Sequence, residues 1–247
     1  MYNGIERSVF EMNDINKSLF KYEDPLKQNV KITNLKMQVV NNTFAKKFMS
    51  EHHYSQTCPN LYYALGFYYN SQILCMVCFG PPSGRLLAQA MIEGGNAQNV
   101  CELVRLFAFD WGPKNTESYC IGQSLQWLQN NALDMKLVVS YADPNQGHVG
   151  TIYQATNWLY TGQGSRLVDA YEFYVDGAWI HPRSIFSHYG TTDIQKVSKQ
   201  LGYEVETRLC QHKHRYIYLL GNKRQKRATQ KLLKVSIFDY PKQEASI

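Results

Sequence analysis

Alternation between short apolar runs and amphipathic helical stretches constrains the fold of this chain more than any other feature. Each apolar run is strand-sized and bounded by turn residues, whereas residues 116–132 carry apolar side chains at helical spacing. Asn70-Ser71 and Asp176-Gly177 predict two hairpins. Strands that alternate with helices and also pair as hairpins form a mixed sheet. We therefore predict an α/β (α+β) fold with a mixed central β-sheet flanked by helices.

The expected elements follow from the same periodicity. The predicted strands are 35–40, 61–70, 72–79, 100–109, 136–140, 158–160, 168–175, 178–180, 203–208 and 214–220. The predicted helices are 42–54, capped by Asn42 or Thr43, 116–132, capped by Asn115 or Thr116, 149–158 and 191–201. We expect one compact domain over 35–222, preceded by an extension over 1–34 and followed by a basic tail over 223–247.

Basic residues are concentrated near the end of the chain. Six of them lie in twelve residues without an acid, and their number equals the formal net charge of the chain, +6. They are Lys223, Arg224, Lys226, Arg227, Lys231 and Lys234. Such a cluster suits a phosphate backbone or an anionic membrane, and the alternative is a solvated charged helix or tail.

The remaining composition limits the cellular setting. No apolar run approaches the roughly 20 residues that a membrane span needs, and Met1–Phe10 lacks the pattern of a secretory signal. We therefore expect buried, reduced cysteines and no membrane association. Cys75 and Cys78 resemble half of a zinc site, but they lie in a predicted strand and no second cysteine pair follows. His212 and His214 share a predicted strand face, which is weak evidence for a metal site, so we predict no metal ligands.

The densest group of polar side chains follows the strand 136–140. The segment from Ser140 to His148 contains Ser, Tyr, Asp, Asn, Gln and His, and ligand crevices form at the carboxyl ends of strands in α/β sheets. Asp143 before Pro144 is also typical of a turn that caps the next helix, and both roles stay open. Tyr153 and Asn157 would share a face of that helix. Its first turn would lie near the Asp143 loop, so Tyr153 can lie close to Asp143. A carboxylate and a phenol in one cleft can act as base and acid.

Two further features indicate anion binding. Arg105 lies in an apolar strand, where a partly buried guanidinium needs an anion or several acceptors. Glu102 would point to the opposite face, so Asp143 or a ligand phosphate is the better partner. The segment Asn115-Thr-Glu-Ser118 opens a helix after a turn, and its free backbone amides could hold an anion; ordinary capping is the alternative.

Four blocks of this sequence together resemble the Mom family of phage DNA modification enzymes. They are Glu102-Leu-Val-Arg105-Leu, Asn115-Thr-Glu-Ser118, Ser140-Tyr-Ala-Asp143-Pro and Gly147-His-Val-Gly-Thr-Ile-Tyr153-Gln-Ala-Thr-Asn157-Trp. The resemblance spans about residues 60–220. It implies an acetyltransferase-like fold of the GNAT type and conversion of adenine in DNA to an N6-carbamoylmethyl derivative, which protects the genome from host restriction. The place of action would be the cytoplasm of the host cell.

The resemblance also implies roles for individual residues. Asp143 would orient the adenine amine or accept its proton, and Tyr153 would assist proton transfer or departure of the leaving group. Arg105 would hold Asp143 or an anionic donor, and Ser118 would hold the donor. The other residues expected to contact the donor substrate are Asn115, Thr116 and Ser140. The expected contacts to double-stranded DNA are Tyr141, His148, Asn157, Lys223, Arg224, Lys226 and Arg227.

The donor is the least specified part of this hypothesis. The stretch Trp111–Ser118 lacks the glycine pattern with which GNAT enzymes hold pyrophosphate, although a predicted helix N-terminus lies there. Acetyl-CoA or another activated two-carbon donor, with or without iron, therefore stays open. The alternatives to DNA modification are an N-acetyltransferase that uses acetyl-CoA on a protein or small amine, and an inactive binding module on the same fold.

Overall fold

The computed structural model describes residues 30–242 apart from residue 85, residues 165–170 and residue 211. Contacts within the chain define two units. The first comprises Met1–Val139 and Tyr218–Lys234, and the second comprises Ser140–Ile217 and Val235–Ile247. Two boundaries of this division fall within strands, and the third falls between Lys234 and Val235, outside any strand. The domain limits expected from the sequence stay a prediction, and most of the expected extension over 1–34 lies outside the described residues.

The first unit is built on an antiparallel meander. The strands are β1 (Lys36–Val39), β2 (Tyr63–Tyr69), β3 (Gln72–Gly80) and β4 (Val100–Ala108), and β4 continues the sheet by pairing in parallel with β5 (Leu137–Ala142). Asn70 and Ser71 both have positive φ, 46° and 66°, as a two-residue turn of the I′ type requires. This confirms the predicted hairpin between β2 and β3. The helices of this unit are α2 (Asn42–His52), α3 (Leu87–Met91), α4 (Thr116–Asn131) and α8 (Lys223–Lys231).

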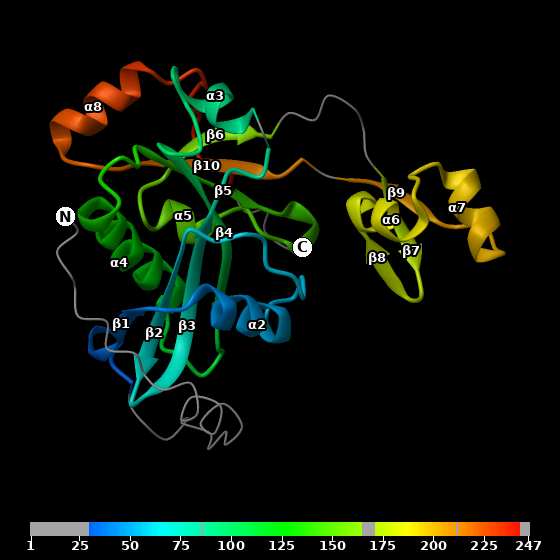
Figure 1. Cartoon of the computed structure of the whole chain (residues 1–247), viewed down its shortest axis with the longest axis horizontal. Coiled ribbons are helices and arrows are strands. Elements are labelled where there is room, and N and C mark those ends of the chain that lie inside the picture. The colour runs from blue at the N-terminus through cyan, green and yellow to red at the C-terminus, as the bar shows by residue number, and fades with distance from the viewer. Residues whose placement is uncertain (1–29, 85, 165–170, 211, 243–247) are drawn as a thin grey trace. The chain divides into compact units, whose positions relative to one another are not determined.

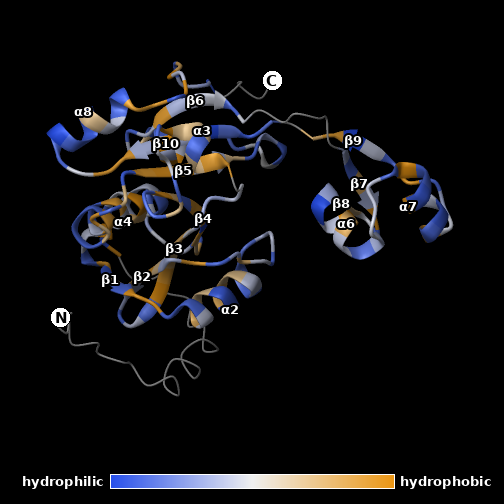
Figure 2. Cartoon of the chain, turned by 45° about the horizontal axis from the view of Figure 1, so that its top comes forward, coloured by the Kyte–Doolittle hydropathy of each residue, from blue (hydrophilic) through white to orange (hydrophobic). Residues whose placement is uncertain are grey.

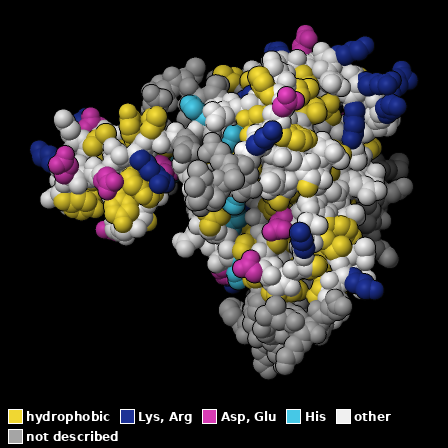
Figure 3. Space-filling view, turned by 180° about the vertical axis from the view of Figure 1, so that it is seen from behind, with side chains coloured by type: hydrophobic (Ala, Val, Ile, Leu, Met, Phe, Trp, Pro, Cys, Tyr) yellow, Lys and Arg dark blue, Asp and Glu magenta, His cyan; other side chains and the backbone are white. Residues whose placement is uncertain are grey.

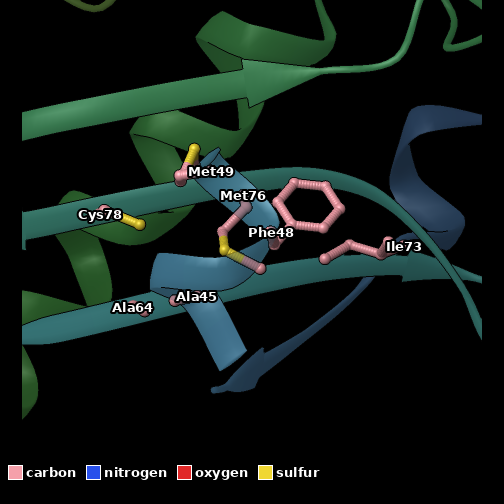
Figure 4. Packing of buried hydrophobic residues seen from close by; sticks show 7 residues of the cluster. All are labelled: Ala45, Phe48, Met49, Ala64, Ile73, Met76 and Cys78. Atoms are coloured by element: carbon pink, nitrogen blue, oxygen red, sulfur yellow. The ribbon is translucent and has the colours of Figure 1, made fainter. Parts of the chain in front are cut away.

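Helix α2 packs its apolar stripe on this sheet (Figure 4). Ala45, Phe48 and Met49 follow the three- and four-residue spacing of one helical face, and all three are buried against Met76 and Cys78 of β3. The side chain of Asn41 caps the helix by accepting a hydrogen bond of 2.8 Å from the backbone N–H of Thr43. The predicted cap, Asn42 or Thr43, was therefore wrong by one or two residues.

The second unit contains the end of β5 and the start of β10 (His214–Leu219). Between them lie the 3₁₀ turn η3 (Pro144–Gln146), the short helix α5 (Thr151–Gln154) and strand β6 (Leu159–Gln163), which pairs antiparallel with β10. The strand order of the large sheet is β1-β2-β3-β4-β5-β10-β6, with both parallel and antiparallel neighbours. The predicted α/β fold with a mixed sheet and flanking helices is confirmed (Figure 1).

A small second sheet follows β6 in the chain. Its strands are β7 (Tyr171–Val175), β8 (Ala178–Ile180) and β9 (Thr207–Leu209), in the order β8-β7-β9, and its helices are α6 (Pro182–Tyr189) and α7 (Ile194–Leu201). Phe173 and Val175 alternate with exposed residues along β7 and pack with Ile185, Val197 and Val205 into a core of their own. The hairpin predicted at Asp176-Gly177 is confirmed, with φ of 52° and 81°.

The last segments of the chain return to both units. In the first unit, Glu93 N–H donates to the carbonyl of Leu232, and Lys234 N–H donates to that of Met91, at 2.8 and 2.9 Å. In the second unit, Phe238 N–H donates to Tyr160 O at 2.9 Å. The region after residue 222 is thus folded up to residue 242, beginning with helix α8.

Several helices differ from the prediction, and α3 and α6 lie where no helix was predicted. The helix predicted over 149–158 shrinks to Thr151–Gln154, because Gly150 before it and Asn157 after it have positive φ, 87° and 60°. Tyr153 and Asn157 consequently do not share a helical face. Helix α8 corresponds to the charged helix that the sequence left open as one form of the basic segment; it is strongly hydrophilic, in contrast to the apolar strand β3 (Figure 2). No described helix is long and apolar enough to cross a membrane.

Candidate active site

Asp143 stands directly after strand β5 and is held at both carboxylate oxygens. Oδ1 accepts a hydrogen bond of 3.0 Å from the backbone N–H of Asn145, which caps η3. Oδ2 lies 2.7 Å from the ammonium nitrogen of Lys213. The side chain of Asp143 is only 15% exposed. The turn role expected for Asp143 is therefore confirmed, and the turn leaves the second oxygen directed at a cation.

Ser140, three residues before Asp143, and Tyr153, which follows Asp143 in the chain, form a buried hydroxyl pair. Ser140, on β5, is 1% exposed, and Tyr153, on α5, is 6% exposed. The Ser140 hydroxyl donates a hydrogen bond of 2.8 Å to the Tyr153 hydroxyl. The end of one strand thus carries Asp143 and also anchors Tyr153. Ser140, which was predicted to contact the two-carbon donor substrate, has its hydroxyl bonded to Tyr153 instead.

Tyr216 on β10 fixes the loop that leads into α5. Its hydroxyl donates to the carbonyl of Val149 and accepts from Nε2 of Gln154 at 3.1 Å, while its ring centroid lies 5.2 Å from that of Tyr153. Burial raises the pKa of Tyr216, so its hydroxyl stays protonated and can donate. A Cβ on Gly150 would collide with the Tyr216 ring, and the φ of 87° also favours glycine there.

The residues expected to contact substrate near this loop differ in exposure. Tyr141 is half-buried, and its ring packs beside Gly164: a Cβ built on Gly164 would lie 3.6 Å from a carbon of that ring. His148 and Asn157 are exposed. His214, which was considered as a metal ligand, instead bonds through Nδ1 to the Tyr160 hydroxyl at 2.8 Å, and His212 lies before the strand rather than within it.

In the first unit, Arg105 is held by a loop that sequence reasoning did not connect with it. Its Nε donates to the carbonyl of Thr57 at 2.8 Å and its Nη2 to the Thr57 hydroxyl at 3.1 Å. Its Nη1 donates to the carbonyl of Val104 at 2.7 Å. The guanidinium thus has several oxygen acceptors. This is one of the two environments expected for a partly buried arginine, the other being an anion. Glu102 accepts from Ser83 N–H at 2.8 Å, which agrees with its placement on the other face.

The positive charge of Arg105 acts on two neighbouring groups. Burial, assisted by this charge, lowers the pKa of His53 to about 4, so its imidazole is neutral at pH 7. A hydrogen bond from the Cys78 thiol lowers the pKa of Cys58 to about 7; Arg105 and Lys46 act in the same direction, while burial opposes them. This part of the first unit therefore holds a thiol that ionises near neutral pH.

The two cysteines of β3 have different hydrogen-bond partners. The Cys78 thiol is hydrogen-bonded to that of Cys58, whereas the Cys75 thiol is hydrogen-bonded to that of Cys120, and both β3 cysteines are buried. Burial also raises the pKa of Cys75. Among the residues that the structure describes, no three His, Cys, Asp or Glu side chains are grouped so that they could hold a metal ion.

The start of helix α4 differs in detail from the expected capping. Asn115 is left-handed, with φ of 68°, and its side chain makes no cap bond. The hydroxyl of Thr116 donates back to Pro113 O at 2.6 Å, and that of Ser118 donates to Asn115 O at 3.1 Å. Asn115 thus occupies the N-cap position as predicted, but its side chain makes no cap bond, and the Thr116 hydroxyl bonds to a carbonyl of the preceding turn instead. The helix itself is confirmed at nearly the predicted limits.

Helix α8 presents the basic cluster on the surface of the first unit (Figure 3). Lys223, Arg224, Arg227 and Lys231 are exposed and line an open concavity of about 480 Å³ together with Ala228. Lys226 differs, because its ammonium lies 4.5 Å from the ring centroid of Tyr218 and bonds to its hydroxyl at 3.2 Å. Asn222 and Gln225 form a reciprocal capping box that begins the helix.

Sequence reasoning missed Lys213, Tyr216 and Thr57. Each meets its partner only through the tertiary fold: Thr57 lies 48 residues before Arg105, and Tyr216 lies 67 residues after Val149. Lys213 could not be paired with Asp143 from the sequence, because this contact depends on β10 lying beside β5.

Comparisons with known proteins agree with the four sequence blocks. The model of the Mom protein family matches residues 34–242. The methylcarbamoylase mom of Escherichia phage Mu is 29% identical over 219 residues, which is 84% of each chain. A GNAT-family acetyltransferase of Streptococcus pneumoniae has a TM-score of 0.43 at 7% identity over 76% of this chain and 99% of its own. A spermidine N-acetyltransferase of Vibrio cholerae has a TM-score of 0.43 at 8% identity, over 76% and 94%. The resemblance inferred from the sequence is thus confirmed at the level of the family: the chain belongs to the Mom protein family.

Proposed function

We propose that this protein is an enzyme that converts adenine in phage DNA to an N6-carbamoylmethyl derivative and so protects that DNA from restriction. Membership of the Mom family and similarity to a methylcarbamoylase support the reaction class. The observation that carries the proposal is the arrangement at the end of β5, where Ser140 anchors Tyr153 and Asp143 follows with a carboxylate held at both oxygens.

The chemistry explains why a carboxylate and a phenol suit this site. The new bond joins N6 of adenine to a methylene carbon, the bond from that carbon to the leaving group breaks, and the amine loses one proton. The exocyclic amine is a weak nucleophile, because its lone pair is delocalised into the ring. In the proposed reaction Asp143 orients this amine or accepts its proton, and Tyr153 assists the leaving group.

Other residues are proposed to bind the activated two-carbon donor. They are Arg105 and Ser118, with Asn115 beside Ser118 at the start of α4; the Thr116 side chain is buried, and its hydroxyl bonds to Pro113 O. The exposed charges of α8 are proposed to bind DNA phosphates, which supplies affinity independent of sequence. Because N6 is inaccessible in stacked duplex DNA, the adenine is expected to flip out of the helix.

The test is to co-express the protein with a plasmid and to analyse the plasmid nucleosides by mass spectrometry. We expect N6-carbamoylmethyl adenine with the wild-type chain and none with Asp143→Ala. Asp134→Ala, at an exposed loop position, is the matched control and should retain the product. Absence of product with the wild-type chain, together with turnover of acetyl-CoA on amines, would instead indicate an N-acetyltransferase. Full activity of Asp143→Ala would remove Asp143 from the reaction.

A further inference from the structure

We propose that Lys213 is a positioning residue of the active site, whose ammonium holds the Asp143 carboxylate in the orientation that receives the adenine amine. This inference rests on the proposed function, and it assigns a residue that neither the sequence motifs nor the family resemblance singled out. Its basis is the 2.7 Å contact between Nζ of Lys213 and Oδ2 of Asp143.

The backbone of Lys213 is fixed before its side chain is placed. Its carbonyl accepts a hydrogen bond of 2.8 Å from Gly164 N–H, and the next residue, His214, pairs with Gln163 across β10 and β6. The imidazole of His214 bonds to the Tyr160 hydroxyl. The backbone of Lys213 is therefore held by the pairing of β10 with β6. Only the side-chain torsions of Lys213 remain free, and the contact with Asp143 fixes them.

The two ends of the ion pair differ in exposure. The Lys213 side chain is 36% exposed, whereas the Asp143 side chain is 15% exposed. An exposed lysine pair contributes little to stability, but a carboxylate that is largely withdrawn from water needs a partner. The pair therefore matters for Asp143 more than for the stability of the fold.

The carboxylate keeps capacity for a substrate. Each oxygen of an ionised carboxylate can accept about two hydrogen bonds. Oδ1 accepts one from Asn145 and Oδ2 accepts one from Lys213, so the carboxylate is immobilised at both ends and can still accept a bond from an amine. Without Lys213, only the hydrogen bond from Asn145 to Oδ1 would restrain rotation of the Asp143 carboxylate. The carboxylate would keep its negative charge but would no longer be held in one orientation.

A first experiment tests the ion pair without depending on the DNA reaction. The purified full-length protein is treated briefly with acetic anhydride, and acetylation of each lysine is measured by peptide mass spectrometry. We expect Lys213 to be acetylated several-fold faster in Asp143→Asn than in the wild-type chain, because the ion pair shields its amine. Exposed Lys36 should react equally in both. Equal acetylation of Lys213 in the two proteins would overturn the inference.

A second experiment tests the role of the pair. In cells carrying the plasmid, Lys213→Met should lower the initial rate of adenine modification about 10- to 100-fold, the scale expected for a misplaced catalytic group. Lys213→Arg should recover part of that rate, and both variants should bind a labelled DNA duplex with wild-type affinity. Lys36→Met is the charge-matched control and should behave as wild type.

Three results would contradict the assignment. An unchanged rate in Lys213→Met would show that Asp143 needs no such partner. A rate loss that follows weaker DNA binding would make Lys213 a phosphate contact. Equal losses in Lys213→Met and Lys213→Arg, with a lower urea midpoint in both, would indicate a structural role alone. A wild-type chain that forms no modified adenine would refute the proposed function itself, whatever the acetylation experiment shows about the pair.

Discussion

The hydroxyl of Ser140 donates a hydrogen bond of 2.8 Å to the hydroxyl of Tyr153, with both side chains almost fully buried. This bond joins the short helix α5 to the strand whose end carries Asp143. The position of the Tyr153 phenol is therefore set by the central sheet and not by the four-residue helix on which it lies.

Replacing Tyr153 with Phe should impair the reaction more than the fold. The variant loses the phenol proposed to assist the leaving group, and we expect modified adenine to fall by about 10²- to 10⁴-fold. Loss of one buried hydrogen bond should lower the free energy of unfolding by only about 1–3 kcal/mol. Nucleoside mass spectrometry and urea unfolding measure the two effects. Tyr54→Phe, at a tyrosine that is 64% exposed, should change neither; a fully active Tyr153→Phe would exclude a role for the hydroxyl.

Neutralising the exposed face of α8 should weaken DNA binding without altering the site at the end of β5. For the triple variant Lys223→Gln, Arg224→Gln and Arg227→Gln, the slope of log affinity against log salt should decrease by up to about 3, since each phosphate contact contributes about 0.9. Fluorescence anisotropy of a labelled duplex measures this slope. The matched control replaces the exposed residues Lys31, Lys36 and Lys47 with Gln. Identical slopes in both triple variants would mean that α8 does not contact DNA.

Replacing Gly150 with Ala should disturb the loop between Asp143 and Tyr153. The new Cβ would meet the Tyr216 ring, and the φ of 87° is unfavourable for alanine. We expect the free energy of unfolding to fall by more than about 1 kcal/mol and the product to decrease. Gly122→Ala, in the interior of α4 with open space around its Cβ, should instead raise stability by about 0.5–1 kcal/mol. Wild-type stability in Gly150→Ala would show that the loop can shift without cost.

Cys58 should be the first cysteine to react with iodoacetamide. It is the half-buried one among six, and its thiol has a pKa of about 7, lowered mainly by the hydrogen bond from Cys78. Because the thiolate is the nucleophile, its alkylation rate should rise as the pH increases through about 7 and then level off. In Arg105→Met the rise should occur at higher pH, since a neighbouring positive charge is lost. Peptide mass spectrometry identifies the residue; preferential alkylation of another cysteine would contradict the prediction.

Local signals predicted the sheet well. The hairpins at Asn70-Ser71 and Asp176-Gly177 were recognisable because a tight turn between two apolar runs tolerates few residues, and all four residues have the positive φ that this turn requires. The central strands were recognisable because β3 and the start of β4 are continuously buried and therefore apolar.

Helices without an apolar stripe were predicted poorly. Helix α8 buries only Thr229 among its nine residues, so its sequence lacks the periodicity from which a helix is inferred. Its capping box, Asn222 and Gln225, was the available signal. The interval before Trp158 has helical composition, but Gly150 and Asn157 limit α5 to four residues.

The candidate site was predicted in part. Asp143, Ser140 and Tyr153 belong to segments close in sequence, so their neighbourhood follows from one strand, one turn and one short helix. The partners Lys213 and Thr57 come from distant segments, and their contacts depend on strand order and on loop conformation. No local pattern specifies either quantity.

Residues 232–240 form hydrogen bonds with segments of both units, and this affects the order in which the protein can fold. The first unit is completed by residues 232–234 and the second by Phe238 and Tyr240, whose hydroxyl donates to Trp158 O at 2.6 Å. Neither unit therefore has all of these contacts until residues 232–240 have been synthesised. Such late, long-range closure slows folding relative to local pairing. A chain that ended before residue 232 would lack these contacts in both units.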